Sequence, residues 1–187
     1  MPSNEIKVWD IVVRSFHWVL VGAFTIAFLT EEGPMDVHVA AGYTIAGLLA
    51  VRIVWGLVGS RHARFSDFIY RPRVVVQFLK DTLHQKAKRY IGHNPAGGAM
   101  ILLLLLNLII ITITGFAVYG IEDHAGPMAA MMAGAGESAE DALEEVHEFF
   151  SWFTLILVVF HVAGVVMESR LHGENLVRAM VNGRKRA

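Results

Sequence analysis

Two histidines lie in one apolar stretch of this chain, where imidazole is unusual. In the segment VHEFFSWFTLILVVFHVAGVV, residues 146–166, His147 begins the apolar run and His161 interrupts it. Fourteen residues turn an α-helix through about four full turns, so the two imidazoles share one face and lie about 21 Å apart along the axis. Histidines within long apolar helices usually face the interior of a helix bundle or a functional site.

Two more histidines, His17 and His38, lie in the two earlier apolar stretches. In an antiparallel bundle, His38 begins the second stretch level with His147, near one surface of the bundle, which we call the outer one. His17 lies nearer the opposite, inner surface, level with His161. The four histidines therefore form two pairs at two depths. Helix bundles build cofactor sites from facing side chains of this kind.

Two imidazoles at one depth suit a haem better than a zinc ion. Zinc sites usually need three or four protein ligands, and no cysteine or carboxylate lies inside the apolar stretches to complete such a set. A haem needs only two axial ligands, because its porphyrin supplies four nitrogens. Two pairs predict two six-coordinate haems, which suit electron transfer and leave no open position for oxygen. The alternative for a single histidine is a hydrogen bond between helices.

Two arginines could contact the haem at the inner level. Arg52 follows His38 by fourteen residues and shares its helical face, and Arg14 lies about one turn before His17. Both could pair with haem propionates. The alternative is that both are interfacial anchors whose charged ends reach water.

The remaining histidines fall in connections or in the tail. His172 is the main rival of His161, because it lies eleven residues later and nearly in phase. Glu168 and Arg170 place His172 at or beyond the end of the apolar stretch, so His161 is the better candidate.

The composition supplies an apolar scaffold for these histidines. The 187 residues are 55% hydrophobic, and the excess over a soluble domain falls into four blocks that could each cross a membrane as a helix. These blocks are residues 11–29, 37–58, 99–119 and 149–167. The first block lacks a cleavage signature, so we expect it to be retained. We predict one all-α integral membrane four-helix bundle over residues 1–187.

Charge is sorted between the two sides of this bundle. All 16 Lys and Arg lie near the termini, near the inner ends of the first two blocks, or in the connection between the second and third. The other two connections, residues 30–36 and 120–148, carry eleven acids and no base. The positive-inside rule therefore predicts that both termini are cytoplasmic.

The connections carry weaker patterns. Apolar residues recur at helical spacing between about residues 72 and 90, which predicts an amphipathic helix at the membrane surface, with a partner-binding helix as the alternative. The outer segment 124–141 is rich in Gly, Ala and Met and predicts a flexible or interfacial loop. Asn94 and Pro95 are a suitable N-cap and first-turn pair for the third block.

Several segments resemble the bacterial cytochrome b561 and Ni,Fe-hydrogenase b-type cytochrome family over nearly the whole chain. They are VWDIVVRSFHW, VHVAAGY, RIVWGLVGSRHARF, GHNPAGGAM, VHEFF with the later FH, and HGENLVRAMVNGRKR. The resemblance implies a four-helix core with two b-type haems that exchanges electrons with membrane quinone. It implies His17 and His161 as ligands of the inner haem iron, and His38 and His147 as ligands of the outer one. The chain lacks a fifth apolar block and looks closer to the short stand-alone type.

The sequence thus predicts a dihaem conduit in a bacterial inner membrane, between the quinone pool and a periplasmic or membrane redox partner. The acidic outer side favours a basic partner such as a cationic c-type cytochrome; the alternative is that these acids only keep the loops soluble and oriented. A superoxide oxidase that reduces quinone is the second hypothesis, although an anionic substrate would favour a basic outer face. A histidine proton relay is the third. We expect lipid contact and no nucleic acid, and a homodimer stays open.

Overall fold

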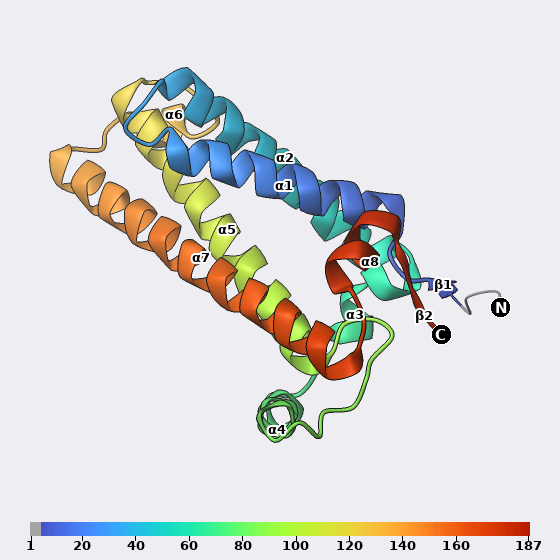
Figure 1. The fold of residues 1–187 in the computed structure, drawn as a ribbon. Coiled ribbons are helices and arrows are strands. Elements are labelled where there is room, and N and C mark those ends of the chain that lie inside the picture. The colour runs from blue at the N-terminus through green and yellow to red at the C-terminus, as the bar shows by residue number, and fades with distance from the viewer. Residues whose placement is uncertain (1–4) are drawn as a thin grey trace.

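Four long helices form the body of the protein in a computed structural model that describes residues 5–187 (Figure 1). They are α1 (Ile11–Leu29), α2 (Met35–Val58), α5 (Pro95–Glu122) and α7 (Glu137–His172). Each is long and apolar enough to cross a membrane. The prediction of an all-α membrane helix bundle is therefore confirmed, and α5 and α7 extend beyond the apolar blocks from which they were predicted.

Shorter elements gather mainly at the end of the bundle that carries both termini. They are β1 (Glu5–Lys7), η1 (Arg61–Ala63), α3 (Phe65–Phe68), α4 (Pro72–Leu83), α8 (Leu176–Asn182) and β2 (Arg184–Arg186), and α6 (Ala129–Met132) lies at the opposite end. Strand β1 pairs antiparallel with β2, with Glu5 opposite Arg186. This small sheet, which the sequence patterns did not predict, joins the two ends of the described chain.

The four long helices are arranged as two hairpins. Helices α1 and α2 pack along each other, as do α5 and α7, whereas α2 and α5 make the main contact between the hairpins. An apolar cluster fills this region, with Ala23 from α1, Ile45 and Leu49 from α2, and Leu105 and Leu108 from α5. Helices α1 and α7 approach each other less closely than the helices within a hairpin, although Phe28 packs edge-on against Trp152 with ring centres 5.1 Å apart. Side chains of the two hairpins therefore face each other across the space between them.

Side-chain caps fix the starts of two of the long helices, α1 and α5. Asp10 accepts a hydrogen bond of 2.9 Å from the amide of Val13 at the start of α1. Asn94 accepts one of 2.7 Å from the amide of Gly97, and Pro95 occupies the first turn of α5. The cap expected at Asn94 is therefore confirmed.

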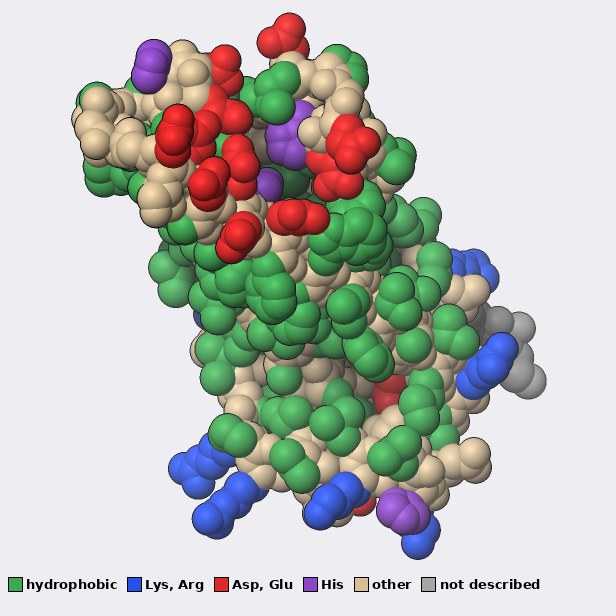
Figure 2. Space-filling model, turned by 90° about the vertical axis from the view of Figure 1, so that its left-hand side faces the viewer, with side chains coloured by type: hydrophobic (Ala, Val, Ile, Leu, Met, Phe, Trp, Pro, Cys, Tyr) green, Lys and Arg blue, Asp and Glu red, His purple; other side chains and the backbone are tan. Residues whose placement is uncertain are grey.

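The surface is divided into three zones along the bundle axis. Figure 2 shows acidic side chains gathered at one end, a broad apolar band in the middle, and Lys and Arg at the other end. The exposed apolar side chains of the band belong mainly to the four long helices. This is the pattern of a protein whose middle contacts lipid and whose ends contact water.

Helix α4 is shorter than the helix expected over residues 72–90. It ends at Leu83, and Gln85 has a positive φ of 58°. The following residues bind the C-terminal tail instead: Arg89 forms an ion pair with Glu174 at 2.5 Å, and the Tyr90 carbonyl accepts from Lys185 Nζ at 2.9 Å. These long-range contacts draw the chain away from a helical path.

The outer connection is more helical than expected over residues 124–141. Besides the short α6, the first turns of α7 already begin at Glu137, so the acidic residues up to Glu148 are helical. Glu137 and Glu140 lie in the first turn of α7. Negative charge there is stabilised by the positive end of the helix dipole, and a 36-residue helix projects well beyond a hydrocarbon core of about 30 Å.

Candidate functional site

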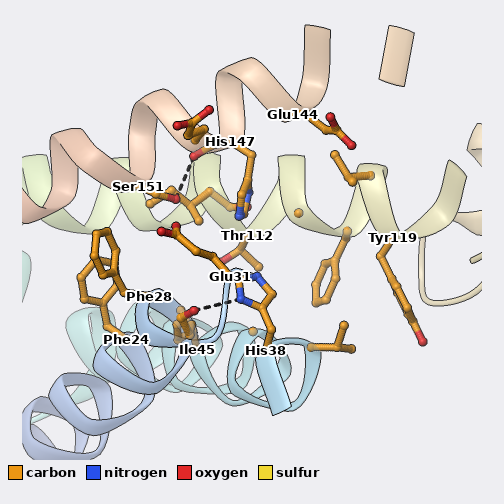
Figure 3. Close-up of a pocket in the computed structure, with 18 of the residues that line it drawn as sticks. Phe24, Phe28, Glu31, His38, Ile45, Thr112, Tyr119, Glu144, His147 and Ser151 are labelled. Carbon is orange, nitrogen blue, oxygen red and sulfur yellow. Dashed lines mark hydrogen bonds between the residues drawn. The ribbon is translucent and has the colours of Figure 1, made fainter. Parts of the chain in front are cut away.

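The outer histidine pair joins helices that belong to different hairpins. The ring centres of His38 in α2 and His147 in α7 lie 6.2 Å apart, with ring planes at 65°. Figure 3 shows the two side chains pointing toward each other across the space between the hairpins. The structure thus brings together two residues that are far apart in the sequence.

Main-chain carbonyls orient both outer imidazoles. Nδ1 of His38 lies 2.9 Å from the carbonyl oxygen of Ala27, and Nδ1 of His147 lies 3.0 Å from that of Ile111. A carbonyl oxygen can only accept, so each Nδ1 donates its proton and each Nε2 keeps a free lone pair. Metal-binding histidines use this arrangement, because the bond at the second nitrogen fixes the ring orientation.

A cavity of about 390 Å³ opens between the hairpins at this pair. Gly42, one turn after His38, lines the cavity, and a Cβ built on it would meet no atom within 4 Å. A Cβ on Gly115 would lie only 2.9 Å from Cε1 of His147. The apolar part of the lining is Phe24, Ala27, Phe28, Val39, Ile45, Leu108, Ile111, Phe116 and Val118. The two glycines therefore preserve space for a bulky apolar group and for the histidine ring.

Carboxylates surround the mouth of this cavity. Figure 2 shows acidic side chains around an opening in which histidine is visible. The acidic residues that line the cavity are Glu31, Glu32, Glu144 and Glu148, and its described lining contains no Lys or Arg. Nearby, Glu122, Glu140 and Glu144 bring carboxylate oxygens within 4.8 Å of one another. The mouth therefore attracts cationic groups and repels anions.

The inner histidine pair also links the two hairpins. The ring centres of His17 in α1 and His161 in α7 lie 6.5 Å apart, with ring planes at 48°. Trp18 packs edge-on against His17, with ring centres 4.9 Å apart. Nδ1 of His17 is buried without a hydrogen-bond partner, so the carbonyl contact that orients each outer ring is missing for this one.

Both pairs have the spacing expected for a metal ion held between two imidazoles. A metal–imidazole bond is about 2 Å long and the ring centre lies about 1 Å beyond the nitrogen, so such an ion separates the ring centres by roughly 6 Å. The observed separations are 6.2 Å for the outer pair and 6.5 Å for the inner pair. Each pair can therefore supply two opposed nitrogen ligands.

The two arginines singled out from the sequence have different surroundings. Nη1 of Arg14 donates to the Val181 carbonyl, so the guanidinium holds the end of α8, although its Nε has no partner. Arg52 is only 4% exposed, and its Cζ lies 4.9 Å from the ring centre of Phe65. Nη1 of Arg52 is buried without a partner. Arg52 therefore keeps a free donor inside the protein.

Asp10 ties the inner ends of α1 and α2 together. Besides capping α1, it accepts a hydrogen bond of 3.0 Å from Nε1 of Trp55 and another from the Ser60 hydroxyl. Burial raises the pKa of Asp10, but the hydrogen bonds from Ser60, Trp55 and the main chain outweigh it, so the pKa lies below its usual value. The carboxylate therefore stays charged beside the inner site.

Asn107 braces the second hairpin between the two histidine levels. Its Nδ2 donates to the Phe150 carbonyl at 3.0 Å and to the Thr154 hydroxyl. Asn107 and Thr154 are both buried. These bonds fix α7, which carries one histidine of each pair, against α5.

His93 is the inner-end histidine that the sequence patterns missed. Its ring lies between Trp9 and Phe68, with ring centres 4.5 Å and 4.7 Å away. Hydropathy places His93 in a connection, so the pairing of histidines in the apolar blocks did not include it. The signal for it in the sequence was its position in the segment GHNPAGGAM.

His172, the rival of His161 as a ligand, contacts a carboxylate instead. Its Nε2 lies 3.4 Å from a Glu168 oxygen.

Comparison with known proteins gives one consistent result. A family model described as prokaryotic cytochrome b561 matches residues 8–183. A probable Ni/Fe-hydrogenase B-type cytochrome subunit of Rhizobium leguminosarum bv. viciae is 26% identical, covering 99% of this chain and 90% of its own. Its counterpart in Azotobacter chroococcum mcd 1 is 29% identical over 97% of this chain and 88% of its own. No solved structure matches the chain.

Proposed function

The chain belongs to the prokaryotic cytochrome b561 family, and we propose that it is a b-type cytochrome that carries electrons across a membrane through two haems. The family implies haem b. The observation that supports two haems is the presence of two histidine pairs with ring centres 6.2 Å and 6.5 Å apart, one at each end of the space between the hairpins. Each pair would supply the two protein ligands of one haem iron.

The proposed ligands divide between the hairpins. His38 and His147 would hold the outer iron through Nε2, because their Nδ1 protons are engaged by the carbonyls of Ala27 and Ile111. His17 and His161 would hold the inner iron. Bound haem supplies one-electron chemistry between its ferrous and ferric states, and two protein ligands leave no position for oxygen. The protein fixes the rings in advance, which limits reorganisation when an electron moves.

Helix α7 sets the distance between the two haems. His147 and His161 lie fourteen residues apart in one continuous helix, which separates the two histidine levels by about 21 Å. The Asn107 bonds to α7 lie between the levels. Electrons would therefore cross the membrane from one haem to the other within a rigid four-helix frame.

We infer a bacterial inner-membrane location with both termini in the cytoplasm. The support is the separation of charge seen in Figure 2, with acids at one end of the bundle and Lys and Arg at the other. The basic end carries both described ends of the chain. The positive-inside rule places such an end in the cytoplasm, so the cavity at His38 and His147 faces the periplasm.

We propose that the two electron-transfer partners are membrane quinone and a protein on the outer side. The curated relatives are named as Ni/Fe-hydrogenase cytochrome subunits, so a hydrogenase is the first candidate for the protein partner. The acidic mouth of the outer cavity also fits a partner with a basic surface, such as a cationic c-type cytochrome. The same acids disfavour superoxide, an anion, as a substrate.

Haem stoichiometry tests this proposal. The purified wild type should contain two b haems by reduced-minus-oxidised spectra, and His147→Ala and His161→Ala should each lose one. His172→Ala is the matched control, because it removes another α7 imidazole and should leave both haems in place. A wild type without haem, or two haems in both variants, would contradict the proposal. Absence of haem from the wild type would instead favour the proton relay.

A further inference from the structure

Buried polar atoms without a partner gather at one end of the protein. Within residues 5–187 the side-chain atoms that are buried and lack a hydrogen bond are Arg14 Nε, His17 Nδ1, Arg52 Nη1, His93 Nδ1, Glu168 Oε1 and His172 Nε2. All belong to the inner end, and the outer pair contributes none. Buried donors in folded proteins are nearly always paired. Such a group of unpartnered polar atoms, most of them nitrogens, indicates a polar binding partner at the inner end.

Arg52 and His93 approach this region from two different elements and share one wall. The Cζ of Arg52 lies 5.9 Å from the ring centre of Phe68, and the ring centre of His93 lies 4.7 Å from it. Phe68 itself is 1% exposed. The two unpartnered nitrogens, Nη1 of Arg52 and Nδ1 of His93, therefore lie in one buried neighbourhood.

This neighbourhood is at the depth of the inner histidine pair. Arg52 follows His38 by fourteen residues in α2, and His161 follows His147 by fourteen residues in α7. Because His38 and His147 face each other and both helices run inward, equal steps bring Arg52 and His161 to the same level. A group held by His161 thus lies within reach of Arg52.

The charge around His93 is predominantly positive. Burial, together with the nearby Arg52, His62, Lys185 and His161, lowers the pKa of His93 to about 3. His93 therefore remains neutral and can donate an N–H. It also lies two residues before α5, so the positive end of that helix dipole adds to the field.

The nearest carboxylates are already engaged. Asp10 accepts from Trp55 and Ser60, Asp67 contacts His62 at 2.8 Å, and Glu174 pairs with Arg89 and Lys185. No protein carboxylate is hydrogen-bonded to Arg52 or His93 in the described chain. Asp10 acts on Arg52 only through its charge and makes no hydrogen bond to it, so a bound carboxylate would supply the partner that Nη1 of Arg52 lacks.

We propose that Arg52 and His93 form a carboxylate-binding site for a propionate of the haem held by His17 and His161. This inference rests on the proposed function. Arg52 supplies the cationic donor and His93 a neutral N–H donor, while Arg14 secures α8 through Val181. The two arginines that look equivalent in the sequence thus have separate roles.

Haem titration of the apoprotein tests the site, with iron protoporphyrin IX compared with its dimethyl ester, which lacks the carboxylates. Arg52→Leu and His93→Phe should each weaken binding of the inner haem about tenfold with the free acid. With the ester, each variant should bind like the wild type. His93→Gln retains an N–H donor and should recover most of the affinity. His84→Phe, at an exposed histidine outside this region, is the control.

Two further measurements keep the test decisive. The outer haem should be retained in every variant, which shows that the protein is folded. Arg52→Leu should lower the midpoint potential of the inner haem, because it removes a positive charge that favours the reduced, ferrous state. Arg52→Lys retains the charge and should shift that potential less. Equal losses with the acid and the ester would overturn the inference, as would unchanged binding in both variants. A wild type that binds no haem would overturn the proposed function itself.

Discussion

His38 and His147 face each other with ring centres 6.2 Å apart, and each donates its Nδ1 proton to a main-chain carbonyl. The two acceptors are Ala27 of α1 and Ile111 of α5, so each ring is oriented by the helix that packs beside its own. The hairpins therefore do more than bury apolar surface: every long helix contributes one group to the outer pair or to its orientation. Preorganisation of this kind lets a ligand bind without rearranging the bundle.

Gly115→Ala should disturb the outer site selectively. A Cβ at this position would lie 2.9 Å from Cε1 of His147, so the ring must move away from its carbonyl partner. We expect weaker binding of the outer haem and a changed low-spin electron paramagnetic resonance signal, with the inner haem unaffected. Gly134→Ala is the control, because a Cβ there meets no atom within 4 Å. Identical spectra for the two variants would show that the close approach has no role.

The helices and the histidine pairs were predictable because the signals for them are local. Hydropathy marked the four blocks, and the fourteen-residue interval between His147 and His161 fixed a shared helical face. The pairing with His17 and His38 followed from depth once an antiparallel bundle was assumed. These properties depend on helix periodicity and span length, which a single chain displays directly.

The surroundings of the inner site were not predictable in the same way. His93 lies between Trp9 and Phe68 because separate connections fold against one another, and no periodic pattern encodes that contact. The end of α4 was misjudged for a related reason, since Arg89 and Glu174 are brought together by the tail. Long-range polar contacts override local helix preference wherever a connection meets a distant segment.

Asn107→Leu should loosen the second hairpin. The substitution removes the bonds to Phe150 and Thr154 and leaves the Thr154 hydroxyl with its bond inside α7. We expect a loss of about 1 kcal/mol in the free energy of unfolding in detergent, the usual scale for a polar contact between membrane helices. Thr25→Val, which removes a hydroxyl bonded within α1, should change much less. If both variants lose the same amount, the contact between helices is not the cause.

Acidification should weaken the tie between α1 and α2. The pKa of Asp10 is below its usual value in the folded protein, because the bonds from Ser60 and Trp55 outweigh burial. A group with a depressed folded pKa contributes stability that is present above its unfolded pKa, about 3.9, and is lost as the pH falls through the folded value. Thermal unfolding followed by Trp fluorescence should therefore show a steeper decline below about pH 4 in the wild type than in Asp10→Asn. Parallel pH profiles would assign the decline to other carboxylates.

Charge reversal at the cavity mouth should slow electron exchange with a cationic c-type cytochrome. Glu31 and Glu148 line the outer cavity, and their negative potential raises the encounter rate with a basic surface. In stopped-flow oxidation of the reduced protein at low ionic strength, Glu31→Lys with Glu148→Lys should lower the rate constant about tenfold. The difference should shrink as salt rises, because screening shortens the range of the field. Asp81→Lys, in the α4 segment at the opposite end, should leave the rate unchanged. A wild-type rate that does not depend on salt would show that the carboxylates have no role in docking. The better partner would then be a hydrogenase that contacts this face through an apolar surface.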